Sequence, residues 1–112
     1  MQNFQEDKLW QESYVALMDV HEALDGAHGA ENGRLVDDVI KSATHVTAKI
    51  ADGLSRIDKR FGRDILLDAV GHVAVVRTHL AVAWGRGLMP DETFQALDTK
   101  YANLSTSLQQ RK

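Results

Sequence analysis

Apolar side chains recur every three to four residues in four separate stretches of the chain. Glycine-rich breaks near residues 26–33, 53 and 85–87, together with the single proline, divide these stretches from one another. This spacing is typical of helices that bury one face, and no stretch alternates as a strand does. The pattern predicts four helices, over residues 5–25, 33–54, 59–86 and 91–109.

Polar residues stand where these helices should begin. Asn3 or Asp7 can cap the first helix, and Asn32 can cap the second. Pro90 suits a first-turn position of the fourth helix, where the following acidic residues complement the positive end of the helix dipole. Four amphipathic helices joined by short turns hide their apolar faces by packing side by side. The sequence therefore predicts an all-α, antiparallel, up-down-up-down four-helix bundle that occupies residues 1–112 as one domain.

The third segment is apolar over a wider arc than one bundle seam requires. Its apolar positions include Phe61, Ile65, Val70, Val76 and Trp84. Two explanations remain open from the pattern alone: a central helix that contacts both neighbours, or an interface with other subunits.

Composition limits the compartment and the chemistry. The 112 residues contain no cysteine, so disulfides and thiolate metal sites are excluded, and a reducing cytoplasm is expected. The first residues lack the basic start and apolar run of a signal peptide, and no uncharged stretch approaches the roughly 20 residues of a membrane helix. We therefore expect a cytoplasmic protein with no membrane partner.

Charge is acidic overall but clustered. The net charge of −3 disfavours a general nucleic-acid binder, and the first 25 residues hold six acids against Lys8. One basic cluster stands out as a candidate patch for an anion or a nucleic acid, and its residues are Arg56, Lys59, Arg60 and Arg63. A solvated basic face is the simpler interpretation. We expect nucleic-acid binding at this patch to be weak and sensitive to salt.

Residues of the second and third helices resemble a known family. Residues 41–53 read KSATHVTAKIADG, residues 65–72 read ILLDAVGH, and residues 78–80 read THL. This text resembles the four helix bundle proteins also called 23S rRNA intervening-sequence proteins. Three positions depart from the usual family pattern, where Lys49 replaces Asn, His72 replaces Ser and Val75 replaces Glu. The resemblance implies a bundle that often assembles as a five-fold ring and has no established catalysis.

The resemblance also suggests which residues act together. If helices two and three pack as in the family, Lys49 and Asp52 share a helix face and lie near His72 as a polar network, with an interhelical ion pair as the plainer interpretation. The wide apolar arc, taken with the family's ring-forming habit, predicts an oligomer interface at Phe61, Val70, Val73, Val76, Leu80 and Trp84.

No complete catalytic motif is present, and no enzymatic activity or cofactor is expected. Asp64, Asp68 and His72 repeat at four-residue steps, but the Glu-x-x-His motif of di-metal bundles does not occur, so no metal site is predicted. We expect a non-catalytic, self-assembling bundle, most simply a pentamer, that serves as a scaffold or protein-interaction subunit. The alternative is an accessory protein that associates with nucleic acid or a reverse transcriptase, as retroelement members of the family do.

Overall fold

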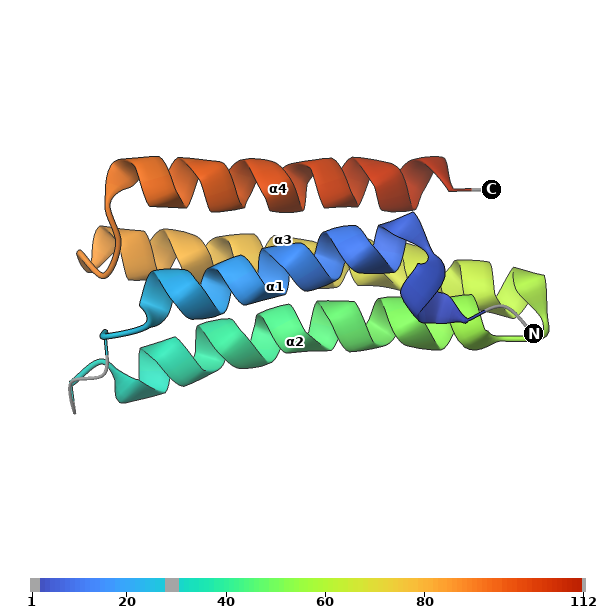
Figure 1. Ribbon diagram of the computed structural model, residues 1–112, viewed down its shortest axis with the longest axis horizontal. Coiled ribbons are helices and arrows are strands. Elements are labelled where there is room, and N and C mark those ends of the chain that lie inside the picture. Colours follow the sequence, from blue (N-terminus) through green and yellow to red (C-terminus); the bar gives the residue numbers. More distant parts are fainter. Residues whose placement is uncertain (1–2, 28–30, 112) are drawn as a thin grey trace.

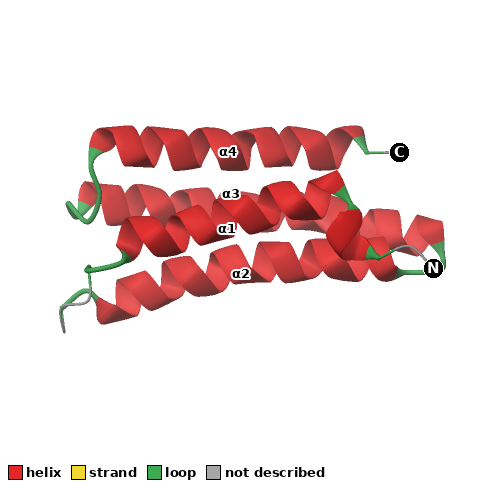
Figure 2. Cartoon of the chain, viewed as in Figure 1, coloured by secondary structure: helices red, strands yellow, loops and turns green. Residues whose placement is uncertain are grey.

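The chain forms four long helices in this computed structural model, which describes residues 3–27 and 31–111 (Figure 1). A 3-10 turn, η1, comes first, and the elements are η1 Phe4–Glu6, α1 Lys8–Leu24, α2 Gly33–Ser55, α3 Lys59–Gly85 and α4 Asp91–Gln110. The described residues contain no strand (Figure 2). The predicted all-α class is confirmed. The predicted first helix was wrong at its start, where residues 5–7 belong to the 3-10 turn and its cap, and Gly29 in the predicted turn lies outside the described residues.

Consecutive helices run in opposite directions along an elongated bundle of 44 × 22 × 20 Å (Figure 1). Within the described ranges, α1 and α3 each contact both α2 and α4, but they do not contact each other. α1 and α3 therefore occupy diagonal corners of the bundle, and their outward faces lie on opposite sides of the molecule.

Side-chain caps fix the starts of three elements. Asn3 accepts a hydrogen bond from the Gln5 amide, Asp7 accepts one from the Leu9 amide at 2.9 Å, and Asp58 accepts two at the start of α3. Asn32 precedes α2 as predicted, but its side chain makes no capping hydrogen bond. Pro90 occupies the N-cap of α4, one position before the first turn predicted for it.

The core consists of aliphatic side chains from all four helices around one large aromatic residue, Tyr101. Its ring is fully buried, and its hydroxyl has no hydrogen-bond partner among the described residues. Burial raises the pKa of Tyr101 well above its ordinary value, so the phenol stays neutral. An unpaired buried hydroxyl costs about 1–3 kcal/mol, which the surrounding apolar contacts must offset.

Two glycines let α2 and α3 cross closely near their connection. A Cβ on Gly62 would lie 2.5 Å from the Gly53 carbonyl oxygen, and a Cβ on Gly53 would meet the Leu66 side chain at 2.8 Å. Both distances are too short for real atoms, so the crossing requires glycine on each helix. Gly53 therefore serves the packing of α2 against α3, while the helix itself continues to Ser55.

By length and composition, α3 is apolar enough to span a membrane, in contrast to the expectation from sequence. Two ion pairs hold it within the bundle instead: Asp68 pairs with Lys49 of α2, and Arg77 pairs with Asp98 of α4 at 2.7 Å. Only 33% of its most apolar window is buried. The inner side of α3 thus accounts for part of its apolar surface, and the remainder faces outward.

Candidate functional sites

The outward side of α3 is a continuous apolar strip, which we call the outer α3 face. Its three large side chains, Leu67, Val75 and Val82, are 40%, 45% and 46% exposed. Smaller exposed residues fill the strip between them, namely Gly71, Ala74 and Thr78. The Thr78 hydroxyl donates to the Ala74 carbonyl within the helix, so it presents mainly its methyl group. The strip is an unpartnered helix face of the kind that marks an interaction surface.

Several residues predicted for an oligomer interface lie elsewhere. Val73, Val76 and Leu80 are buried in the core of the single chain, so this part of the prediction was wrong. They belong to the inner stripe of α3, which needs its own apolar positions every three to four residues. Val70 is partly buried against the core.

The two aromatic residues of that prediction are exposed but already have partners. Trp84 stacks on Phe94 with ring centroids 4.7 Å apart, and its indole nitrogen donates to Asp91 at 2.6 Å. Phe61 is 49% exposed and lies under the Arg56 guanidinium. Trp84 thus fastens α3 to α4, which leaves Phe61 as the freer aromatic surface.

Gly71 has no packing role within the chain. It is exposed on the outer α3 face, and a Cβ there would meet nothing within 4 Å. We expected close helix approach to explain this glycine, and no neighbouring helix of the chain provides it. A mid-helix glycine costs roughly 1 kcal/mol relative to alanine.

A second apolar surface, the outer α1 face, lies on the opposite side of the bundle. It consists of Tyr14, Val15 and Met18, which are 43%, 52% and 46% exposed. Trp10 stacks on Tyr14 with centroids 5.1 Å apart, and Phe4 contacts the other side of Trp10 edge-on. The outward residues of α2 between these two faces are polar or small, and include Asp37, Lys41, Thr44, Ala48 and Asp52.

The predicted polar network of Lys49, Asp52 and His72 forms around a different acid. Lys49 Nζ lies 2.8 Å from Asp68 Oδ2, and His72 Nε2 lies 3.3 Å from the same oxygen. Asp52 turns away and pairs with Arg56 at 2.8 Å, four residues along its own helix. The bond from Lys49 lowers the pKa of Asp68, which therefore stays ionised.

His45 extends this network on α2, with its ring 4.4 Å from that of His72 and edge-on to it. These side chains are half-exposed or exposed, and exposed ion pairs contribute only about 0–1 kcal/mol each. Within residues 3–27 and 31–111, no three His, Asp or Glu side chains converge as metal ligands would. The arrangement is that of an interhelical ion pair that fixes the register of α2 against α3.

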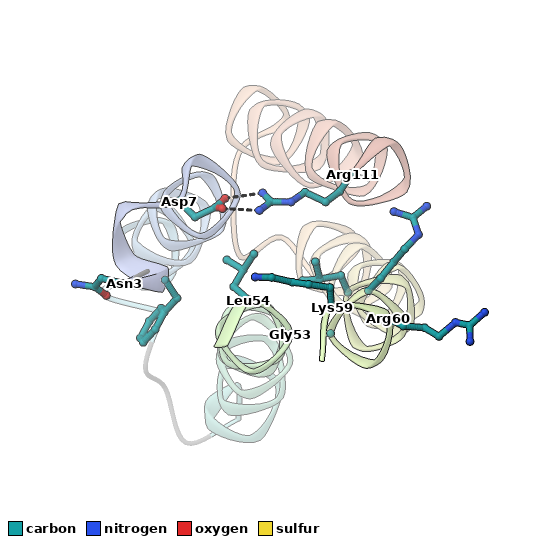
Figure 3. Close-up of a pocket in the computed structure, with 11 residues that line it drawn as sticks. Asn3, Asp7, Gly53, Leu54, Lys59, Arg60 and Arg111 are labelled. Atoms are coloured by element: carbon teal, nitrogen blue, oxygen red, sulfur yellow. Dashed lines mark hydrogen bonds and ion pairs between the residues drawn. The ribbon is translucent and has the colours of Figure 1, made fainter. Parts of the chain in front are cut away.

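The basic cluster borders a pocket of about 470 Å³ at the end of the bundle where α2 meets α3 (Figure 3). Lys59, Arg60 and Arg63 line it, and Arg56 does not, because its guanidinium is held by Asp52. Phe4, Leu54 and Leu66 supply apolar wall, and the two glycines of the helix crossing complete it. We call this cavity the basic pocket.

A paired charge closes one side of the basic pocket. Arg111 donates two hydrogen bonds to the Asp7 carboxylate, at 2.8 and 2.7 Å, and so joins the C-terminal end of the described chain to the start of α1 (Figure 3). The hydrogen bonds from Arg111 lower the pKa of Asp7, although its partial burial opposes that shift. Neither residue was singled out from the sequence, because 104 positions separate them.

Arg63 is the unusual member of the basic pocket. Its Nη1 atom is buried and has no hydrogen-bond partner among the described residues. Lys59 and Arg60 likewise form no ion pair with a described residue. The pocket thus combines unanswered positive charge with an apolar wall.

The fold and these surfaces define a four-helix bundle in which one helix is apolar on both its inner and its outer side. The chain belongs to the 23S rRNA-intervening sequence protein family, whose sequence profile matches residues 5–110. No individual curated protein is similar enough to count as a match. The resemblance inferred from residues 41–53 and 65–80 is thereby confirmed, and the family description names no reaction.

Proposed function

We propose that this protein is a non-catalytic bundle that assembles with copies of itself and serves as a scaffold or protein-interaction subunit. The outer α3 face carries the proposal. Three large aliphatic side chains in one strip leave a substantial apolar area in contact with water, and covering such area releases roughly 25 cal/mol per Å². A second copy of the chain is the occupant that would always be available.

Opposite placement of the two apolar faces favours head-to-tail contact. The outer α1 face of one copy meets the outer α3 face of the next, so each subunit uses two different surfaces. Such heterologous contacts close into a ring when the rotation between neighbours allows it. A five-membered ring is the closed form that the family resemblance suggests.

Gly71 supports the same arrangement. Because the chain itself does not use the space beside Gly71, its cost is offset if a neighbouring helix approaches the outer α3 face closely there. A membrane is a less suitable cover for this face, since the ion pairs of Asp68 and Arg77 would have to remain beside it.

Directed cross-linking tests the head-to-tail contact, and the absence of native cysteine makes it clean. We expect the double variant Val15→Cys, Val75→Cys to form a ladder of covalent oligomers with a short bismaleimide. The matched variant Ala48→Cys, Val75→Cys, with one thiol on the polar α2 surface, should form none. A ladder from both variants, or from neither, would contradict the proposed contact.

A second function, association with nucleic acid or a reverse transcriptase, is favoured only by the unpaired basic residues of the pocket. The acidic net charge of the chain opposes it. Fluorescence anisotropy with labelled single-stranded RNA tests this alternative. We expect weak binding that disappears as salt is raised to physiological strength, and tight binding at that ionic strength would favour the alternative instead.

A further inference from the structure

The charges of the basic pocket fall into two groups. Asp7 and Arg111 satisfy each other through two short hydrogen bonds. Arg63 and Lys59 have no such acid, and the buried Nη1 of Arg63 has no described acceptor. Buried charged donors in folded proteins nearly always have acceptors, so the pocket presents a donor suited to an anion from outside the chain.

The remainder of the wall is suited to an apolar group. Phe4, Leu54 and Leu66 line the cavity beside these cations, and the Lys59 side chain extends across it toward Leu54 (Figure 3). A volume of about 470 Å³ lies within the range of sites that hold small organic molecules, which combine an apolar wall with a few placed polar groups.

We propose that the basic pocket is a binding site for a small organic anion, in which a carboxylate or phosphate head accepts hydrogen bonds from Arg63 and Lys59 while an apolar body contacts Phe4, Leu54 and Leu66. The proposal does not depend on self-assembly, because every residue of the pocket belongs to one chain.

The shape of the charge distribution favours a small molecule over a nucleic acid. Nucleic-acid surfaces carry cations along a track that follows successive phosphates, with aromatic rings free for stacking. Here the unpaired cations gather at one hollow, and the Phe4 ring already contacts Trp10 edge-on. One anionic head fits this arrangement better than a polymer of phosphates.

Calorimetric titration with octanoate tests the proposal, with octylammonium and inorganic phosphate as comparisons. We expect octanoate to bind one site per chain. Octylammonium has the same apolar body with the opposite charge and should bind at least 10-fold more weakly, and inorganic phosphate, which lacks the body, should also bind more weakly. Equal binding of octanoate and octylammonium would overturn the proposal, because the site would then be apolar only.

Variants locate the bound anion. Arg63→Gln and Lys59→Gln should each weaken octanoate binding about 10-fold, whereas Lys41→Gln, which removes a lysine from the polar surface of α2, should leave it unchanged. Amide shifts of Gly53 and Gly62 on titration of the unaltered protein provide a readout that needs no variant. Unchanged affinity in both pocket variants, absence of shifts at both glycines, or displacement of octanoate by stoichiometric single-stranded RNA would overturn the assignment.

Discussion

The outward faces of α2 and α3 differ sharply, although the two helices are neighbours of similar length. α2 presents charged, polar and small residues to solvent, with no large apolar side chain among them. α3 presents Leu67, Val75 and Val82 instead. One amphipathic stripe is all that a helix of a monomeric four-helix bundle requires. The comparison indicates that α2 is finished by the chain's own fold, whereas α3 has a second face in search of a partner.

The difference also explains where the interface prediction went wrong. A helix with apolar residues on two sides gives no sequence signal that separates the inner from the outer side. Val73, Val76 and Leu80 were assigned to the interface, but they are the inner stripe. Leu67, Val75 and Val82 are the outer one, and the four- and seven-residue steps of one strip look like those of the other.

Adjacent valines on α3 should give the largest contrast. Val76 is 0% exposed and Val75 is 45% exposed, so an aspartate at each position tests opposite sides of one helix. Val76→Asp should lower the free energy of unfolding by about 4 kcal/mol or more, because it buries a charge. Val75→Asp should change the stability of the single chain by about 0.5 kcal/mol or less but weaken association about 100-fold. Urea denaturation and sedimentation measure the two quantities, and equal effects at both positions would break the comparison.

Two glycines of α3 should respond to alanine with opposite signs. Gly62→Ala places a Cβ against the backbone of α2 and should destabilise the fold by about 1–3 kcal/mol. Gly71→Ala meets nothing within the chain and should stabilise the helix by about 1 kcal/mol. If a second copy approaches Gly71, the same change should weaken association. Thermal unfolding of dilute protein and sedimentation separate the effects, and destabilisation of the dilute protein by Gly71→Ala would contradict the assignment of this face.

The Asp7–Arg111 pair lies on neither outer face, so it should affect stability without affecting assembly. Asp7→Asn keeps a capping oxygen for α1 but removes the charge. We expect a loss of about 1 kcal/mol near neutral pH. Because the folded pKa of Asp7 is lowered, its contribution is present above the ordinary value of about 3.9 and is lost as the pH falls through the folded value. Urea denaturation from pH 7 to 2.5 should therefore show the difference between variant and wild type closing below about pH 4.

The smallest effect is expected in the core, which the comparison of outer faces leaves untouched. Tyr101→Phe removes a buried hydroxyl that has no described partner and should stabilise the chain by up to about 1 kcal/mol. Thermal unfolding measures it. Destabilisation by 1 kcal/mol or more would mean that the hydroxyl forms a hydrogen bond in solution.

The helices could be predicted from sequence because apolar period, glycine and proline act locally. The predicted bounds of α2, α3 and α4 agree with the structure to within one residue at each end. The error in α1 arose because Asn3 and Asp7 are both good caps, and both are used, one for the 3-10 turn and one for the helix. Spacing alone cannot show that a turn intervenes.

The candidate sites were less predictable because they depend on packing between distant residues. Lys49 and His72 were correctly placed together, but whether Asp52 or Asp68 completes the network depends on the rotation of α2 and α3, which both spacings permit. The basic cluster was visible in the sequence. The pocket beside it requires Phe4 and the Asp7–Arg111 pair, which only the folded bundle brings to the same end.

Light scattering coupled to size-exclusion chromatography of the unaltered protein tests the central claim most directly. The proposed assembly predicts a mass several times the 12.4 kDa of one chain at micromolar concentration, and five times that mass for the ring suggested by the family resemblance. Val75→Asp should return the mass toward one chain while Ala48→Asp on α2 leaves it unchanged. A mass of 12.4 kDa for the unaltered protein would contradict the claim that the outer α3 face is covered by another copy.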